Sequence, residues 1–150
     1  MNKNHSPYFT YFYGSSLSFI AFLLIVLLFP LALKDFDDLW FSYFLVTFWG
    51  IPFVYVTTLI AYGSYFVVKR FNPSWKLSLH LFISALSIAV LFAIGFSEDS
   101  VFSPLLVAII GGAAAFLLGT KAKKSAGSYV VTLIPVLHLA GVVLVSVIFN

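Results

Sequence analysis

Residues 11–33 read YFYGSSLSFIAFLLIVLLFPLAL and contain no charged side chain. A helix needs about 20 apolar residues to cross the hydrocarbon core of a bilayer, which is about 30 Å thick. This stretch is also longer than the apolar core of a cleaved signal peptide, and residues 30–34 (PLALK) offer no cleavage site with small residues at the required spacing. We therefore interpret it as an uncleaved first membrane span.

The rest of the chain has the same apolar character. Of its 150 residues, 62% are hydrophobic and 9% are charged, and the mean hydropathy is +1.09. A water-soluble domain carries charge on about a quarter of its residues, so this composition argues for a protein immersed in lipid. The lack of cysteine excludes disulfides, thiolate metal sites and cysteine nucleophiles.

Four further apolar segments follow the first one. The five predicted spans cover residues 11–33, 39–68, 77–96, 101–119 and 129–149. Long, continuously apolar segments are typical of membrane helices, whereas barrel strands alternate over about ten residues. We predict an all-α integral membrane bundle of five transmembrane helices, forming a single domain over residues 1–150, with four spans as the alternative.

The charged residues lie between these spans, and the connections alternate in sign. Basic residues without an acid occupy the amino terminus, the second connection and the fourth: Lys3, Lys69, Arg70, Lys76, Lys121, Lys123 and Lys124. The first and third connections hold all the acids and one basic residue: Lys34, Asp35, Asp37, Asp38, Glu98 and Asp99. Because Lys and Arg are enriched on the cytoplasmic side, we predict a cell-membrane protein with a cytoplasmic amino terminus and an extracellular carboxyl terminus.

The same basic clusters define the expected partners at the membrane surface. Lysine and arginine beside a span attract anionic lipid headgroups by about 1 kcal/mol per charge. The net charge of +3 comes from these short clusters and from no basic domain, so we expect no nucleic-acid partner.

The second predicted span is too long for the bilayer. A helix over residues 39–68 would measure about 45 Å at about 1.5 Å per residue, against a hydrocarbon core of about 30 Å. Pro52 lies inside it, and a proline removes a backbone hydrogen bond and clashes with the carbonyl four residues earlier. We therefore predict a kink near Gly50.

Two sets of polar residues inside the spans are candidate functional groups. His138 lies near the middle of the last span, three residues after Pro135, and an ionisable group at that depth normally faces the bundle interior or a wet cavity. Tyr55, Thr58, Tyr62 and Tyr65 recur at steps of three and four and form one polar stripe. Both sets have two readings: hydrogen bonds between helices, or a ligand contact, proton relay or shallow cavity. The stripe has a third reading as the docking surface of a partner protein.

Small residues recur every four positions in the fourth span, at Gly111, Ala115 and Gly119. Such spacing lets two helix backbones approach closely. The neighbour is either another span of the same chain or a second subunit. A re-entrant turn at Gly111 and Gly112 is a third reading, and it would return the carboxyl terminus to the cytoplasm.

Catalytic and metal-binding signatures are missing from the sequence. It contains no GxxxxGK[ST], GxGxxG, GxSxG or HExxH motif, and no paired carboxylates inside a span. Its histidines, His5, His80 and His138, lie far apart along the chain, and no carboxylate shares a span with His80 or His138. We expect no metal, no cofactor and no enzymatic activity.

The Met1-Asn2-Lys3 start, the aromatic run after Pro7, the charge-poor body and the Lys69-Arg70 turn point to one resemblance. With these features the chain resembles the small uncharacterised multi-pass membrane proteins of bacilli and their prophages. The resemblance covers length and hydropathy across the whole chain. It implies a bacterial cytoplasmic membrane, and it implies no site residue and no activity.

These observations favour a non-enzymatic accessory, interaction or immunity-type protein that acts through helix–helix contacts with a membrane-protein partner or with itself. The alternative is a small transporter or channel component with a polar path near Tyr55, Tyr62 and His138. Five spans are few for a carrier, so this alternative would need a homo-oligomer to enclose a route.

Overall fold

The computed structural model describes residues 6–33, 39–95, 102–122 and 125–148, with side chains described for residues 6–28, 47–91, 106–122 and 125–148. Five helices account for most of these residues: α1 (Pro7–Leu33), α2 (Leu39–Phe71), α3 (Leu77–Gly95), α4 (Phe102–Lys121) and α5 (Ala126–Ile148). The described residues contain no strand. The predicted all-α class is therefore confirmed.

Local sequence signals set several helix ends. Ser6 precedes Pro7, and its carbonyl accepts from the Thr10 amide at 3.2 Å, so α1 starts one turn before the predicted span. At the start of α5, the amide of Ser128 donates to the Ser125 hydroxyl at 3.2 Å and the amide of Ser125 donates to the Ser128 hydroxyl at 2.9 Å. This reciprocal pair is a capping box, and it starts α5 at Ala126, ahead of the predicted span.

The turn between α2 and α3 is built by Asn72 and Pro73. The residue before a proline is disfavoured in the helical region, and α2 ends at Phe71. The Asn72 side-chain oxygen accepts from the Ser74 hydroxyl at 2.7 Å, and the Asn72 carbonyl accepts from the Trp75 amide at 3.0 Å. This tight turn places Lys76 directly before α3.

Three helices in the described part of the chain are long and apolar enough to cross a membrane: Pro7–Leu28, Thr47–Phe71 and Ala126–Ile148. The described apolar parts of α3 and α4, Leu77–Leu91 and Leu106–Lys121, are shorter. The structure is thus a helical protein with three candidate membrane spans.

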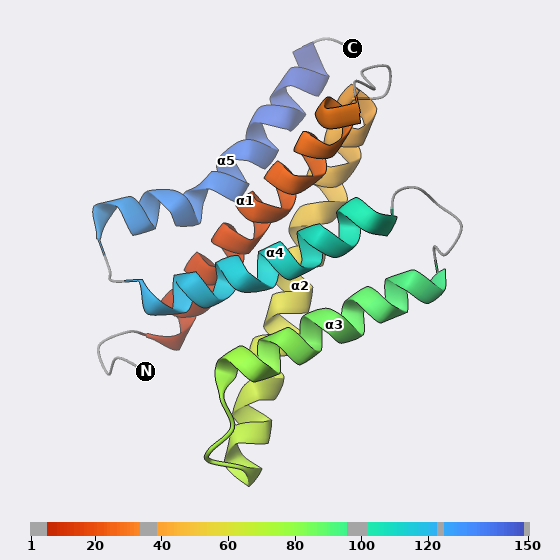
Figure 1. The fold of residues 1–150 in the computed structure, drawn as a ribbon. Helices are drawn as coiled ribbons and strands as arrows, with labels where there is room; N and C mark the ends of the chain where they lie inside the picture. The colour runs from red at the N-terminus through yellow and green to blue at the C-terminus, as the bar shows by residue number, and fades with distance from the viewer. Residues whose placement is uncertain (1–5, 34–38, 96–101, 123–124, 149–150) are drawn as a thin grey trace.

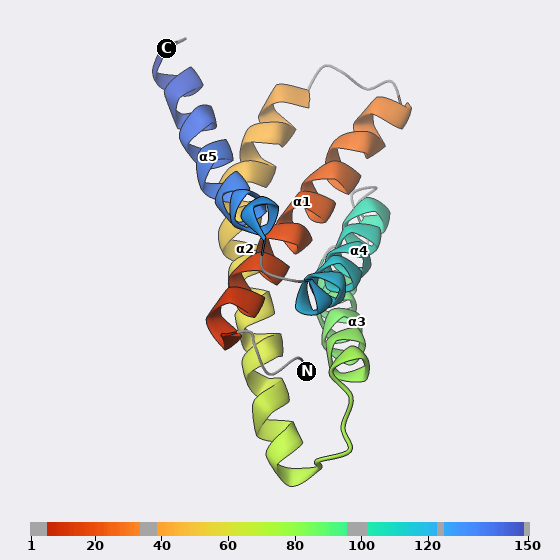
Figure 2. The ribbon, with the colours of Figure 1, turned by 90° about the vertical axis from the view of Figure 1, so that its left-hand side faces the viewer.

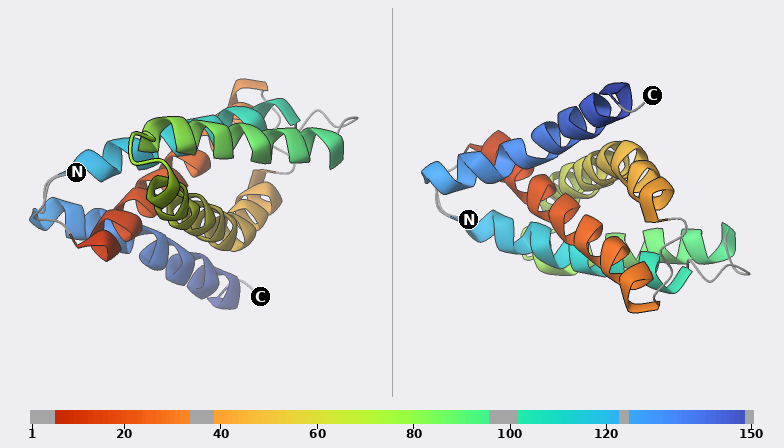
Figure 3. Two further views of the ribbon diagram at one scale, coloured as in Figure 1. Left: turned by 90° about the horizontal axis from the view of Figure 1, so that it is seen from below. Right: turned by 90° about the horizontal axis from the view of Figure 1, so that it is seen from above.

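Helix α1 lies at the centre of the bundle. It contacts α2, α4 and α5, while α3 packs on α4 and α2 (Figures 1 and 2). The view from above in Figure 3 shows α1 crossing between α5 and α2 on one side and α4 on the other. The side chains of α1 therefore meet most of the interior.

Pro52 and Pro135 each lie in a helix that changes direction. Figure 2 shows α2 bending in its middle, where Gly50 and Pro52 lie, as the sequence predicts. Figure 1 shows α5 running across the bundle first and then turning along α1, and Pro135 lies about half-way along this helix. Pro135 is fully buried, so the bend of α5 is held against its neighbours.

The apolar core has two parts. One cluster joins Phe19 and Phe22 of α1 to Val54 of α2 and Ala108 of α4. The other cluster joins Ala61 and Tyr62 of α2, Leu81 of α3 and Phe116 of α4. Together these clusters connect α1, α2, α3 and α4. Helix α5 packs mainly on α1 and α2.

Candidate functional site

The first two residues of the predicted polar stripe, Tyr55 and Thr58, face α1. The Tyr55 hydroxyl lies 2.9 Å from the Ser16 hydroxyl, and the Thr58 hydroxyl lies 2.8 Å from the Ser15 hydroxyl. The Tyr11 hydroxyl donates to the Tyr55 carbonyl at 2.8 Å. Ser15 and Ser16 are both fully buried. The stripe therefore forms hydrogen bonds between α1 and α2.

Ser16 links three helices. Its oxygen lies 2.9 Å from the Phe12 carbonyl in α1 and 3.3 Å from the Thr132 carbonyl in α5, besides its contact with Tyr55. A serine hydroxyl has one hydrogen, so it donates to a carbonyl and accepts from the Tyr55 hydroxyl. Thr132 lies next to Val131, whose carbonyl has no helical donor because Pro135 lacks an amide hydrogen, so Ser16 contacts α5 close to its bend.

The last two residues of the stripe, Tyr62 and Tyr65, contact α4 and α3. The Tyr62 ring lies 5.5 Å from the Phe116 ring of α4, and the Tyr65 ring lies 5.9 Å from the His80 ring of α3. The Lys69 ammonium lies 5.4 Å from the centre of the Tyr65 ring. Both tyrosines are buried, and both line a hollow at the basic end of the bundle.

His138 lies elsewhere, between α5, α2 and α1. Its Nε2 atom lies 3.0 Å from the hydroxyl of Thr47, which is fully buried, and its ring lies 5.9 Å from the Phe19 ring. Which atom donates depends on the imidazole tautomer. The structure thus places the candidate residues in three separate clusters: His138 with Thr47, Tyr55 and Thr58 with α1, and Tyr62 and Tyr65 near α3 and α4.

The small-residue face of α4 packs against α1 of the same chain. A Cβ atom at Gly119 would lie 2.7 Å from the Cα atom of Gly14, and one at Gly112 would lie 2.8 Å from the Ser18 hydroxyl oxygen. A Cβ atom at Gly111 would meet the flexible end of Ile25. Ala115 lies on the same face, four residues from Gly119. Gly111 and Gly112 both lie within the continuous helix α4, and no re-entrant turn occurs there.

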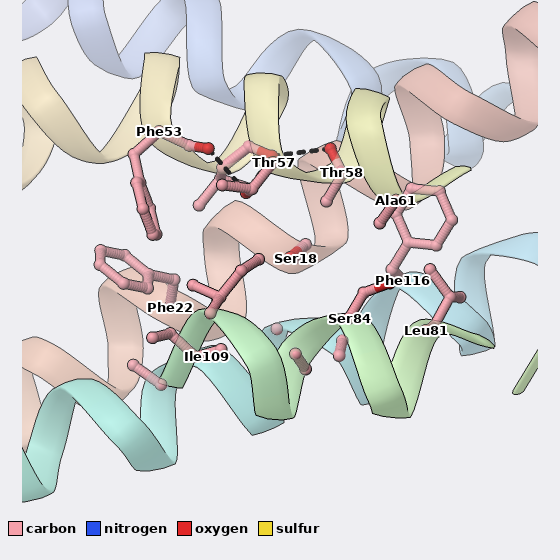
Figure 4. Close-up of a pocket in the computed structure, with 16 residues that line it drawn as sticks. Ser18, Phe22, Phe53, Thr57, Thr58, Ala61, Leu81, Ser84, Ile109 and Phe116 are labelled. Atoms are coloured by element: carbon pink, nitrogen blue, oxygen red, sulfur yellow. Dashed lines mark hydrogen bonds between the residues drawn. The ribbon is translucent and has the colours of Figure 1, made fainter. Parts of the chain in front are cut away.

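A small cavity lies among α1, α2, α3 and α4 (Figure 4). Its volume is about 50 Å³, which is room for a few water molecules, since one water needs about 10–15 Å³ by this measure. Four hydroxyls line it, from Ser18, Thr57, Thr58 and Ser84. The hydroxyls of Thr57 and Thr58 donate to carbonyls of α2 at 2.7 Å, so they offer a cavity occupant lone pairs rather than protons.

One serine–histidine pair lies within hydrogen-bond distance. The Ser64 hydroxyl is 2.9 Å from Nε2 of His80 and 3.2 Å from the Ala61 carbonyl. A nucleophilic serine needs its base oriented by a third group. All five acids of the chain lie outside the described residues, so no carboxylate in the described part orients His80. The pair joins α2 to α3.

No group of three potential metal ligands occurs among the described residues. His80 and His138 lie in different clusters, and His5 lies outside the residues described.

The comparisons with known proteins were negative. No protein-family model matches the chain, and neither the curated proteins nor the solved structures give a match.

Several residues of these clusters escape analysis of the sequence alone. Ser15, Ser16 and Thr47 are hydroxyl residues within long apolar runs, and their role depends on which way each helix faces. A weak signal exists for Ser15 and Ser16, because Gly14, Ser15, Ser16 and Ser18 form the one small polar interval of the first span. For Thr47, no local pattern indicates a histidine 91 residues away.

Proposed function

We propose that this chain is a five-span, non-enzymatic integral membrane protein that acts through lateral contacts with another membrane protein or with itself. An accessory or immunity-type role in a bacterial cytoplasmic membrane fits this description. The amino end would lie in the cytoplasm and the carboxyl end outside. The described basic residues support this orientation, because Lys69, Lys76 and Lys121 gather at one end of the bundle.

The interior polar side chains support a non-enzymatic role, because they form hydrogen bonds with one another. Hydroxyls and imidazoles that could have served a substrate are bonded to one another across helices, as Ser15 is to Thr58 and Thr47 to His138. Such bonds hold a bundle together, each by about 0.6 kcal/mol on average. The clusters are separate, and this arrangement gives less support to a polar path through Tyr55, Tyr62 and His138.

Gly141 is the observation that carries the proposal of a lateral contact. It is exposed in α5, and a Cβ atom built on it would meet nothing within 4 Å. Leu137 and Leu144, which are 64% and 61% exposed, flank it on the same face. A glycine in a helix costs about 1 kcal/mol relative to alanine, and its use in a membrane is to let another helix approach closely. Within the described part of the chain, no helix does so at Gly141.

The glycines of α4 provide the contrast. Gly119 and Gly112 meet α1, so that small-residue face is already occupied. Gly63 of α2 is open as well, and the face proposed for contact with a second protein is the outer face of α5, where Gly141 lies between two exposed leucines.

Substitution of Gly141 tests this proposal. We expect Gly141→Leu to abolish site-specific photocrosslinking from position 144 in intact cells, while abundance and thermal stability in detergent stay unchanged. The matched control is Leu86→Trp on the outer face of α3, where Leu86 is 49% exposed. It should leave the crosslink intact. If unsubstituted protein crosslinks to lipid and to no protein, the lateral contact does not exist.

A further inference from the structure

The basic end of the bundle contains a hollow that the candidate polar clusters do not explain. Its volume is about 630 Å³, and α1, α2, α3, α4 and the turn before α3 all contribute to its wall. Three lysines line it: Lys69 from the last turn of α2, Lys76 from the turn, and Lys121 from the end of α4. They are separated by up to about fifty positions in the sequence, so the fold brings them together.

The charge of this hollow is uncompensated within the described residues. Its lining includes no carboxylate, and the described residues contain no acid at all. Three ammonium groups around one hollow repel each other, and an anion between them would remove that repulsion. Lysine binds phosphate as a point charge, so phosphate is a suitable anion.

A buried donor without an acceptor lies in the same wall. Trp75 lines the hollow, and its indole Nε1 is the one buried side-chain nitrogen or oxygen without a hydrogen-bond partner among the described residues. Buried polar atoms are normally paired, and an indole N–H can only donate. The indole N–H therefore lacks an acceptor among the described residues, and because the atom has almost no accessible surface, a phosphate oxygen in the hollow would reach it after a small shift of the wall.

The start of α3 adds further donors. Lys76 directly precedes this helix, and Ser78 in its first turn lines the hollow. The first amides of a helix have no partner within the helix, and the helix dipole favours an anion beside them. Ammonium groups, an indole N–H, a hydroxyl and helix amides together match the oxygens of a phosphate group.

The apolar part of the wall indicates where such a phosphate comes from. The hollow is also lined by aromatic and aliphatic side chains from α2, α3 and α4: Tyr62, Tyr65, Leu77 and Leu117. Basic pockets between helices on the cytoplasmic side of a membrane bind the headgroups of anionic lipids. A volume of about 630 Å³ lies in the range of small-molecule sites.

We propose that this hollow is a binding site for a phosphate-bearing anion of the size of an anionic lipid headgroup. Lys69, Lys76 and Lys121 neutralise the phosphate, and the Trp75 indole donates a hydrogen bond to one of its oxygens. The site depends on the membrane placement of the bundle and is independent of any contact at Gly141.

Native mass spectrometry of the purified full chain in mild detergent tests the site. The probes are short-chain phosphatidylglycerol, short-chain phosphatidylcholine, and glycerol 3-phosphate without lipid. We expect phosphatidylglycerol to bind saturably and more tightly than phosphatidylcholine. Saturable binding of glycerol 3-phosphate alone would assign the site to a soluble phosphate compound, which keeps the proposed phosphate chemistry and changes its source.

Two triple variants of equal charge separate this site from general surface attraction. Lys69→Gln/Lys76→Gln/Lys121→Gln removes the lysines of the hollow, and binding should weaken about 5-fold per lysine, or about 100-fold in total. Arg70→Gln/Lys123→Gln/Lys124→Gln removes the same number of charges; Arg70 does not line this hollow, and Lys123 and Lys124 lie outside the described residues. It should change binding by less than about 3-fold. Equal losses in both variants would overturn the proposal.

Trp75→Phe provides a second, independent arm. It keeps an aromatic ring and removes the indole N–H, which has no partner among the described residues. We expect binding of the preferred phosphate probe to weaken about 10-fold, with the melting temperature of the ligand-free protein unchanged or higher. Unchanged binding would remove the indole from the site.

Discussion

Gly14 and Gly119 bring the backbones of α1 and α4 into direct contact. A Cβ atom at Gly119 would lie 2.7 Å from the Cα atom of Gly14 and 3.2 Å from its nitrogen. Backbone atoms cannot rotate away as the end of a side chain can. The two helices therefore cross at a point where neither position leaves room for a side chain.

This contact predicts that Gly119→Ala destabilises the protein. The methyl group forces α1 and α4 apart, and overpacking of this kind costs about 1–3 kcal/mol. Gly112→Ala should cost less, because the nearest atom is the Ser18 hydroxyl oxygen, which can rotate. SDS titration of the purified variants in detergent measures the free energy of unfolding.

Gly141→Ala is the control for this series. It adds the same methyl group where nothing lies within 4 Å, so we expect no loss and a gain of up to about 1 kcal/mol from helix propensity. A loss at Gly141 equal to that at Gly119 would show that the α1–α4 contact is not the cause.

The Ser16 hydroxyl is predicted to couple α2 to α1. Ser16→Ala removes the acceptor of the Tyr55 hydroxyl and leaves it unpaired, whereas Tyr55→Phe removes the donor and leaves Ser16 bonded to a carbonyl. We expect Ser16→Ala to be the more costly change, by about 0.5–1.5 kcal/mol. The double variant should cost less than the sum of the two single variants.

Ser87→Ala serves as the comparison for Ser16. The Ser87 hydroxyl is exposed and donates to the Ile83 carbonyl of its own helix at 2.9 Å. Its removal should change the free energy of unfolding by less than about 0.5 kcal/mol. Additive effects of Ser16→Ala and Tyr55→Phe in the cycle would contradict the bond between them.

Much of the helical architecture follows from the sequence, because hydrophobic length and the prolines act locally. The bend of α2 near Pro52 follows from the sequence, whereas the bend of α5 was seen only in the structure (Figures 1 and 2). Helices α1 and α5 begin before the apolar runs, since the caps at Ser6 and Ser125 lie outside those runs. Capping depends on single polar residues and not on hydropathy.

The site is less predictable, because it depends on how the helices face one another. A residue pattern shows that Tyr55 and Tyr62 share a face of α2, but not that α1 meets Tyr55 while α4 meets Tyr62. The gathering of Lys69, Lys76 and Lys121 in one hollow depends on the packing of three helices. Distant partners of this kind are set by tertiary packing.

Reporter fusions test whether α5 crosses the membrane and in which direction. A reporter that is active outside the cytoplasm should be active when fused after Asn150 and inactive when fused after Lys124, at the basic end. This pair of fusions tests α5, the one helix between the two positions, because α3 and α4 leave Lys124 on the same side whether both cross or neither does. Equal activity at both positions would mean that α5 does not carry the chain across, and activity after Lys124 with inactivity after Asn150 would reverse the sidedness predicted from the lysines.

The contact between Thr47 and His138 predicts that this histidine supports the fold rather than a transport step. Thr47 is fully buried, and His138→Phe leaves its hydroxyl without the imidazole 3.0 Å away, which should cost about 1 kcal/mol. Thr47→Val/His138→Phe should restore part of that loss, since neither polar partner is then left alone. A transport role predicts the opposite pattern: both variants lose flux or growth at normal abundance, and the double variant recovers stability without recovering function.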